Sequence, residues 1–211
     1  MPAAPSINTV AVDDVVNAAE GAALTLSGTA EANGKVSISV AGETLAVTAD
    51  ANGQWNLALT PAQVAAMGQG PETITLTQTD AAGNTSPATS KTIAVDTLTP
   101  AAPTIADVAT DNVIGTAEAS TTVLTGSNEA GAVVKVSFAG KDVLPTVTGT
   151  TWSYTLTADD LSAMGQGPET LTVVQTDAAG NSSLPATRDI TVATVAPPAP
   201  VIDPVAGDGV V

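Results

Sequence analysis

Residues 36–40 read Val36-Ser37-Ile38-Ser39-Val40, a strict alternation of apolar and polar side chains. The same alternation recurs in Trp55-Asn56-Leu57-Ala58-Leu59 and in Thr73-Ile74-Thr75-Leu76-Thr77. Successive side chains of a β-strand point to opposite faces, so this period indicates strands with one buried face. Turn-forming pairs, Asn33-Gly34 and Asn52-Gly53, separate such stretches. The sequence therefore predicts short strands joined by tight turns.

The chain contains an internal repeat with a period of about 97 residues, which is typical of a tandem array of structural units. The segment Ala66-Met67-Gly68-Gln69-Gly70-Pro71-Glu72-Thr73 recurs as Ala163-Met164-Gly165-Gln166-Gly167-Pro168-Glu169-Thr170. The segment Gln78-Thr79-Asp80-Ala81-Ala82-Gly83-Asn84 recurs as Gln175-Thr176-Asp177-Ala178-Ala179-Gly180-Asn181. The unit of structure is therefore repeated in tandem.

The starts of the copies predict the domain boundaries. Pro100-Ala101-Ala102-Pro103 opens the second copy, and Pro197-Pro198-Ala199-Pro200 matches it. We therefore expect one domain at residues 1–99 and a second at 100–196. Residues 197–211 would then be a linker and the first strand of a truncated third repeat.

Each copy has the size and pattern of an immunoglobulin-like sandwich, for which about seven short strands separated by turns are typical. A tryptophan, Trp55 or Trp152, is expected to anchor each core. The stretches 60–67 and 157–164 start with a threonine that can act as an N-cap and are followed by glycine, which predicts a short helix. The expected fold class is all-β: two tandem immunoglobulin-like β-sandwich domains, each with about seven strands and one short helix.

The composition is strongly acidic, with 21 Asp and Glu against 5 Lys and Arg, a net charge of −16. Such a surface repels phosphate backbones and anionic lipids, so we expect no nucleic-acid partner. No stretch of the sequence approaches the ~20 apolar residues that a membrane helix needs, so we expect no membrane insertion. Calcium or magnesium are the natural counter-ions, although acidity also serves solubility. The chain lacks histidine and cysteine. It therefore lacks the commonest general base, thiolate chemistry and the usual zinc ligands, and we expect no enzyme.

Two non-enzymatic functions remain. A structural spacer should be duplicated in tandem, as this chain is, whereas a specific binding domain is usually unique. The alternative is an adhesion module that binds a glycan or a host surface. Carbohydrate sites usually expose aromatic side chains, and the candidates here are Trp55, Trp152, Tyr154 and Phe138. The strand pattern assigns most of them to the core, so the spacer is favoured.

Three segments together resemble a known family. They are the junction Val95-Asp96-Thr97-Leu98-Thr99-Pro100-Ala101-Ala102-Pro103, the acidic loop Asp13-Asp14-Val15-Val16-Asn17-Ala18-Ala19-Glu20, and the repeated Thr-Asp-Ala-Ala-Gly-Asn turn. They are similar to the bacterial Ig-like repeats of giant RTX-type and biofilm-associated surface adhesins. The resemblance implies extracellular display on a Gram-negative cell surface after type I secretion. It also implies calcium at or near the junctions between domains. We expect a monomeric chain whose partners are its own neighbouring repeats.

Sandwich geometry predicts where acidic side chains gather, because the last hairpin loop lies at the end where the chain enters and the loop after the first strand lies at the opposite end. Residues of both copies should therefore meet at the junction between them. The candidate calcium ligands are Asp96, Asp177, Asn181, Glu129, Asp13, Asp14 and Glu20. An unneutralised cluster would repel itself, and a bound cation would turn this repulsion into an attraction that stabilises the junction. We place Asp96 and Asp177 first among the ligands.

Each candidate also has a structural explanation. Asp80 and Asp177 can cap tight turns through bonds to the backbone, and exposed loop acids such as Glu20 are common. The second junction departs from the first, since Ala193 stands where Asp96 does and Asn112 replaces Asp14. A metal there would have to recruit other groups, among them Asp111.

Overall fold

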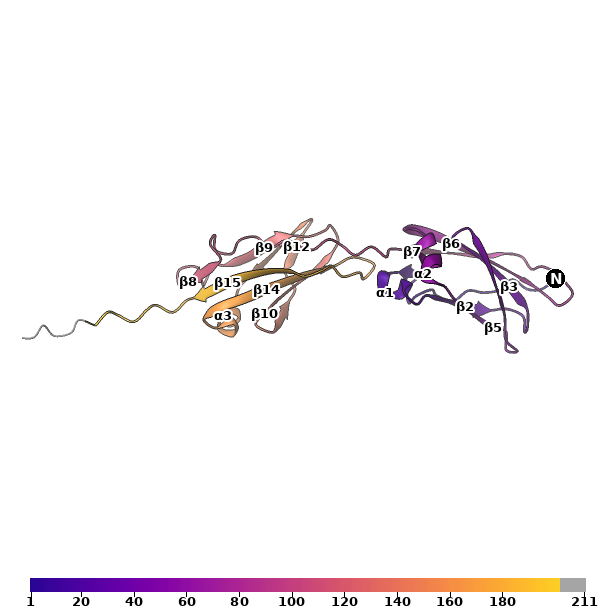
Figure 1. Ribbon diagram of the computed structural model, residues 1–211, viewed down its shortest axis with the longest axis horizontal. Coiled ribbons are helices and arrows are strands. Elements are labelled where there is room, and N and C mark those ends of the chain that lie inside the picture. Colours follow the sequence, from indigo (N-terminus) through magenta and orange to yellow (C-terminus); the bar gives the residue numbers. More distant parts are fainter. Residues whose placement is uncertain (202–211) are drawn as a thin grey trace, which may run out of the picture. The chain divides into compact units, whose positions relative to one another are not determined.

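The computed structural model describes residues 1–201. Contacts between residues divide the chain into two compact units (Figure 1). The first comprises Met1–Ala101 together with Gly131–Val133 and Gln175–Leu184, and the second comprises the other described residues. The strand expected at the start of a third repeat extends into residues 202–211, which lie outside the described residues. Among residues 1–201, no helix is both long and apolar enough to cross a membrane.

The first repeat is a sandwich of two sheets. Five strands form one sheet in the order β1-β7-β6-β3-β4, and β2 pairs with β5 in the other. The parallel pairing of β1 with β7 and the antiparallel pairing of the rest are typical of closed immunoglobulin-like sandwiches. The strands are β1 (Val15–Val16), β2 (Thr25–Thr29), β3 (Lys35–Val40), β4 (Glu43–Thr48), β5 (Gln54–Ala58), β6 (Gly70–Thr79) and β7 (Thr89–Val95).

The second repeat has the same plan with one change. One sheet has the order β11-β10-β14-β15-β8 and the other the order β12-β13-β9. A single strand of the first repeat, β4, is represented here by two, which belong to different sheets. The strands are β8 (Val113–Gly115), β9 (Val123–Ser127), β10 (Val133–Phe138), β11 (Lys141–Val143), β12 (Thr146–Thr148), β13 (Thr151–Thr155), β14 (Gly167–Thr176) and β15 (Ala186–Ala193).

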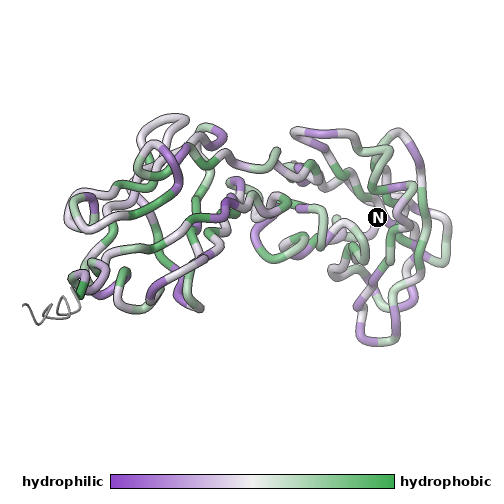
Figure 2. Tube along the Cα trace, turned by 60° about the vertical axis from the view of Figure 1, so that its left-hand side comes forward, coloured by the Kyte–Doolittle hydropathy of each residue, from purple (hydrophilic) through white to green (hydrophobic). Residues whose placement is uncertain are grey.

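The core of each repeat follows the alternation seen in the sequence. Val36, Ile38 and Val40 are at most 2% exposed, and the serines between them point outward. Hydrophobic residues are spread through both units, and hydrophilic stretches occur at several bends of the chain (Figure 2). Trp55 and Trp152 are both 2% exposed, which confirms the prediction that they anchor the cores.

Each tryptophan also fixes the first segment of its repeat. The Nε1 of Trp55 donates to the carbonyl of Ser6 at 3.2 Å, and that of Trp152 donates to Thr104 at 3.1 Å. The backbone passes so close that a Cβ on Gly28 would lie 2.0 Å from the Ser6 carbonyl oxygen. Glycine is therefore required at this position, where two segments of chain and an indole ring meet.

The predicted short helices are present as α2 (Pro61–Ala66) and α3 (Ala158–Met164). Thr60 and Thr157 are their N-caps, each in a capping box that satisfies two backbone donors at the helix start. Val64 is 5% and Met67, the C-cap, 8% exposed, so α2 packs against the core of the first repeat.

Beside the expected short helix, the first repeat has a second helix of one turn, α1 (Ala18–Gly21), which the sequence did not predict. Most of this stretch belongs to the acidic loop at residues 13–20. Asn17 is its N-cap, and the Glu20 side chain accepts from the Asn17 N–H, so a capping box starts this one-turn helix as well. The second repeat has Gly115 at the N-cap position and forms a turn there.

Candidate functional site

The aspartates that begin the repeated Asp-Ala-Ala-Gly-Asn turns cap those turns. Asp80 Oδ1 accepts from the N–H groups of Ala82 and Asn84 at 3.0 and 2.8 Å, and its Oδ2 accepts from Asn84 Nδ2 at 2.8 Å. Asp177 makes the same three bonds to Ala179 and Asn181, each at 2.9 Å. Turn capping, which the sequence left open beside metal binding, is thus a role that both residues perform.

These bonds stabilise the ionised carboxylates. The hydrogen bonds from the Asn84 side chain and backbone lower the pKa of Asp80 below its usual value. Burial by itself would raise the pKa of Asp177, but the bonds from Asn181 outweigh it, and the net pKa is lowered as well. Both turns therefore present full negative charge over a wide pH range.

Three of the candidate ligands lie together in the first compact unit, to which the segment Gln175–Leu184 belongs by its contacts. Asn181 is 4% exposed and donates from Nδ2 both to the carbonyl of Asp96 at 2.8 Å and to Asp177. Its Oδ1 accepts from the N–H of Ala18, also at 2.8 Å. Asn84, its counterpart in the first repeat, is exposed. The carboxamide of Asn181 therefore satisfies backbone groups that the equivalent asparagine does not reach.

The acids of the first loop each lie in a local turn. Asp13 Oδ1 accepts from the N–H of Val15 at 3.0 Å. Asp14 has a positive φ of 67°, and its Oδ1 accepts from the N–H of Val10 and from Lys91 Nζ, both at 2.8 Å. The Lys91 bond is the main cause of a lowered pKa at Asp14. Asp14 therefore serves the turn and an ion pair.

The remaining candidates lie in the second unit. Asp111 Oδ1 accepts from the N–H of Val113 at 2.9 Å, which repeats the arrangement of Asp13. Glu129 follows Asn128, whose Nδ2 donates to the Glu129 carbonyl at 2.7 Å. The Oδ1 of Asn128 is buried without a hydrogen-bond partner among the described residues. One unsatisfied amide oxygen in a loop suits an ordered water molecule.

Calcium fits part of this geometry. The donor chemistry fits, because carboxylate and amide oxygens are the ligands calcium prefers. The grouping is less complete: nowhere within residues 1–201 do three acidic side chains gather closely enough to hold a metal ion. Asp96 and Asp177 would therefore need carbonyl oxygens, Asn181 or water to complete a shell of 6–8 oxygens, as is common in calcium sites.

A buried charge in the second repeat was not predicted. Asp160 is fully buried and accepts from Tyr154 Oη at 2.9 Å, from the Thr157 N–H at 3.0 Å, and from Lys141 Nζ. Burial would raise the pKa of Asp160, but the Lys141 ammonium and the Thr157 bonds outweigh it and hold the pKa far below its usual value. The Thr-x-x-Asp spacing of a capping box was the available signal.

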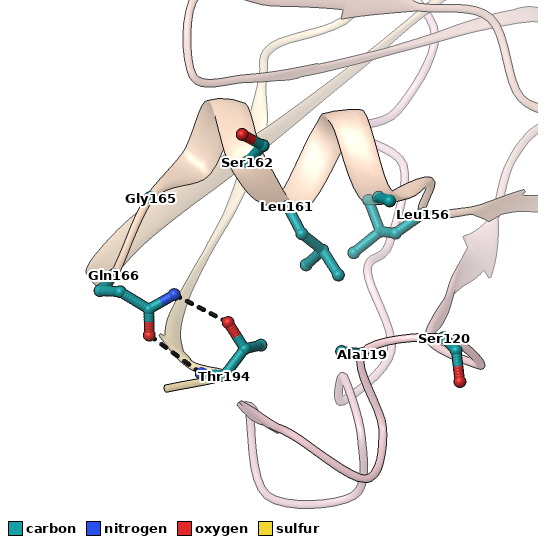
Figure 3. A pocket seen from close by; sticks show the side chains of 9 residues that line it. Ala119, Ser120, Leu156, Leu161, Ser162, Gly165, Gln166 and Thr194 are labelled. Atoms are coloured by element: carbon teal, nitrogen blue, oxygen red, sulfur yellow. Dashed lines mark hydrogen bonds between the residues drawn. The ribbon is translucent and has the colours of Figure 1, made fainter. Parts of the chain in front are cut away.

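Each unit also has a groove beside its longer helix. In the second unit it measures 670 Å³, and in the first an equivalent groove measures 260 Å³. Figure 3 shows Leu156 and Leu161 projecting into the larger groove, with Gln166 and Thr194 hydrogen-bonded at one side. Neither groove is lined by an ionisable side chain. The walls of the larger one are Ala119, Ser120, Leu156, Ala158, Leu161, Ser162, Gly165, Gln166 and Thr194.

Solved structures give two informative similarities. The chain is 30% identical to a protein described as a Ca²⁺-stabilized adhesin that helps an Antarctic bacterium reach out and bind ice, over 93% of this chain, with a TM-score of 0.55. It is 27% identical to a 1.5-MDa bacterial ice-binding adhesin, over 91% of this chain, with a TM-score of 0.53. This chain spans 50% and 65% of those two chains. Among proteins of curated function, none matches the sequence.

The family is shown by the sequence itself. The family model for the bacterial Ig domain matches residues 2–96 and again residues 99–193. These two matches cover both sandwiches, with the capped turns and buried tryptophans at equivalent places in each. The chain therefore belongs to the bacterial Ig domain family and contains two tandem copies of that domain.

Proposed function

We propose that the two domains are spacer repeats of an extracellular adhesin on a bacterial cell surface, stiffened by calcium at the junction between them. The observation that carries the proposal is the tandem duplication of one complete sandwich, with the same end features in both copies. Stacked repeats add length one unit at a time. On this proposal the repeats extend over residues 1–99 and 100–196, a further repeat begins at 197, and the protein is non-enzymatic and exported by type I secretion.

The distribution of aromatic side chains supports a spacer over a glycan-binding module. Trp55, Trp152 and Phe138 are each 2% exposed, and Tyr154 is half-buried with its hydroxyl bonded to Asp160. Sugar recognition usually needs exposed aromatic faces, whereas these rings pack in or against the cores. The partners proposed for this chain are accordingly neighbouring repeats of the same monomeric chain.

Calcium is proposed to bind with Asp96 and Asp177 as its main carboxylate ligands. Asn181, Glu129, Asp13, Asp14 and Glu20 are secondary candidates, and Asp111 is the candidate for the following junction. The support is the strong acidity of the chain, the contact of Asn181 with both Asp96 and Asp177, and the calcium-stabilised adhesin among the similar structures. Extracellular modules commonly bind calcium at about 10⁻⁴–10⁻³ M, so millimolar calcium is the relevant range.

The test is calorimetry of the whole chain in EDTA, in millimolar calcium and in millimolar magnesium. We expect calcium to raise a melting temperature by mass action and magnesium to do so less. Asp96→Ala should remove most of the calcium-dependent rise. Asp177→Ala should do the same, whereas Asp80→Ala, which removes the same turn cap from the first repeat, should leave the rise intact. An equal rise in all three variants would overturn the assignment of these ligands.

A further inference from the structure

The repeated Gly-Gln-Gly segment holds the residue at which the chain leaves each sandwich. Gln69 accepts from the Thr97 N–H at Oε1, at 2.9 Å, and donates from Nε2 to Thr97 Oγ1 at 2.8 Å. Thr97 lies two residues beyond the end of β7 at Val95. One carboxamide therefore hydrogen-bonds to both the backbone and the side chain of Thr97, at the start of the linker.

The second repeat contains the same arrangement. Gln166 Oε1 accepts from the Thr194 N–H at 2.9 Å, and its Nε2 donates to Thr194 Oγ1 at 2.7 Å (Figure 3). The N–H of Val195 also approaches Gln166 Oε1, at 3.3 Å. Thr194 directly follows β15, which ends at Ala193. Two independent copies of the contact, at the same place in each repeat, indicate that the geometry is built into the fold.

The glycines on either side explain how an exposed glutamine keeps one orientation. Gly68 and Gly70 have φ values of 73° and 97°, and Gly165 and Gly167 have 73° and 107°. Glycine adopts this left-handed region without the strain that a Cβ would cause. The backbone on both sides of the glutamine is thus fixed in a turn that other residues adopt only with strain, and the side chain is directed at the exit of the chain.

We infer that Gln69 is a positioning residue for the linker, which fixes the direction in which the chain leaves the first repeat without any metal ion. The inference rests on the proposed spacer function, in which the direction of the linker matters. Past Thr97 the linker contains Pro100 and Pro103, which restrict the backbone further. Gln69 supplies the fixed point from which that stiff segment starts.

The experiment measures the distribution of distances between the two units in the whole chain, by pulsed electron spin resonance in EDTA. The chain has no cysteine, so spin labels can be attached at Thr44→Cys and Thr148→Cys, two exposed strand positions. We expect Gln69→Ala to broaden the distribution. Gln166→Ala removes the same two bonds from Thr194, which follows β15, the last strand of the second repeat, and should leave the distribution unchanged.

A second measurement separates positioning from folding. Hydrogen exchange of the Thr97 amide in Gln69→Ala should be roughly fivefold faster, as expected for the loss of one bond worth about 1 kcal/mol. Gln69→Glu keeps the acceptor for the Thr97 N–H and should restore most of the protection. Equal distance distributions in Gln69→Ala and Gln166→Ala would overturn the inference. Because every sample contains EDTA, that failure is distinct from a failure of the calcium proposal.

Discussion

Strand β4 of the first repeat and strands β11 and β12 of the second follow the same Ala-Gly turn, yet they are paired differently. All six residues of β4 pair with β3. In the second repeat β11 pairs with β10, whereas β12 crosses to the other sheet and pairs with β13. Leu144 and Pro145 lie between them. Proline has no N–H to give to a ladder, so it marks the point where the strand leaves its first sheet.

The two repeats also differ in one polar pair beside that strand. In the first, Gln63 Nε2 donates to the exposed Glu43 at 2.9 Å. In the second, Lys141 occupies the place of Glu43, and the buried Asp160 that of Gln63. The position thus accepts a surface contact between an amide and a carboxyl group in one copy, and a network around a buried carboxylate in the other. The difference shows that two repeats with equivalent cores can use different polar contacts to stabilise the same part of the sandwich.

The largest expected effect concerns the buried tryptophan that both repeats contain. Trp152→Ala should lower the free energy of unfolding of the second repeat by about 3–5 kcal/mol, because it removes the largest buried side chain. Trp55→Ala should do the same to the first. Urea unfolding of the whole chain would show one destabilised transition in each variant. Destabilisation of both transitions by one substitution would mean that the repeats do not unfold independently.

The next largest effect should come from the hydrogen-bonded network around Asp160, which in the first repeat is replaced by the contact between Gln63 and Glu43. Asp160→Ala removes charged hydrogen bonds and a helix cap, and we expect a loss of about 2–3 kcal/mol in the second repeat. Gln63→Ala, at the equivalent half-buried position, should lose about 0.5–1 kcal/mol. Thermal unfolding of both variants provides the comparison. Equal losses would show that burial of Asp160 adds nothing to its contacts.

The pH dependence of stability should also differ between the two repeats because of Asp160. The pKa of Asp160 is lowered in the folded repeat from an ordinary value of 3.8, so its contribution to stability is present above that value. It is lost as the pH falls below 3.8 toward the folded pKa, where the unfolded chain binds a proton first. Asp160→Asn should therefore flatten the acid dependence of the second transition. An unchanged slope between pH 4 and pH 2, a window about two units wide, would contradict it.

The smallest expected effect concerns Lys91 of the first repeat and Arg188 of the second, which occupy equivalent positions. Arg188 donates to the Ile105 carbonyl and to Asp107 at 2.7 Å, while Lys91 in the first repeat contacts Asn8 and Asp14. Arg188→Lys loses the forked geometry, and we expect a loss of about 0.5–1 kcal/mol in the second repeat. Calorimetry with Lys91→Arg as the reciprocal variant would measure it. No change in either would make the two side chains interchangeable here.

Much of the fold could be predicted because it depends on local patterns. Alternation located β3, β5 and β6, and the Thr-Pro start with a glycine stop located α2. The helix α1 was missed although Asn17 and Glu20 have capping-box spacing, because a single turn lacks the apolar periodicity of a longer helix. The split of β4 into β11 and β12 needed knowledge of which sheet each half joins, which Pro145 alone does not decide.

The candidate site was harder to predict because the same residues perform two roles. An Asp-Ala-Ala-Gly-Asn turn needs its aspartate as a cap whether or not a cation binds, so the sequence of Asp177 does not distinguish the two. The hydrogen bonds between Gln69 and Thr97 join positions far apart in the sequence, and no sequence pattern indicates them. The burial of Asp160 depends on Tyr154 and Lys141 from separate strands, and only the three-dimensional arrangement brings them together.

The parallel pairing of β1 with β7, and of β8 with β15, has a mechanical consequence. In each repeat the early strand enters from one end and the final strand leaves at the other. A pull on the two ends of a repeat therefore slides these parallel strands past each other along their length. Their hydrogen bonds lie across the direction of sliding and bear the load together, so they must break at once. Such a domain resists tension by shear, whereas strands pulled from the same end would open one bond at a time.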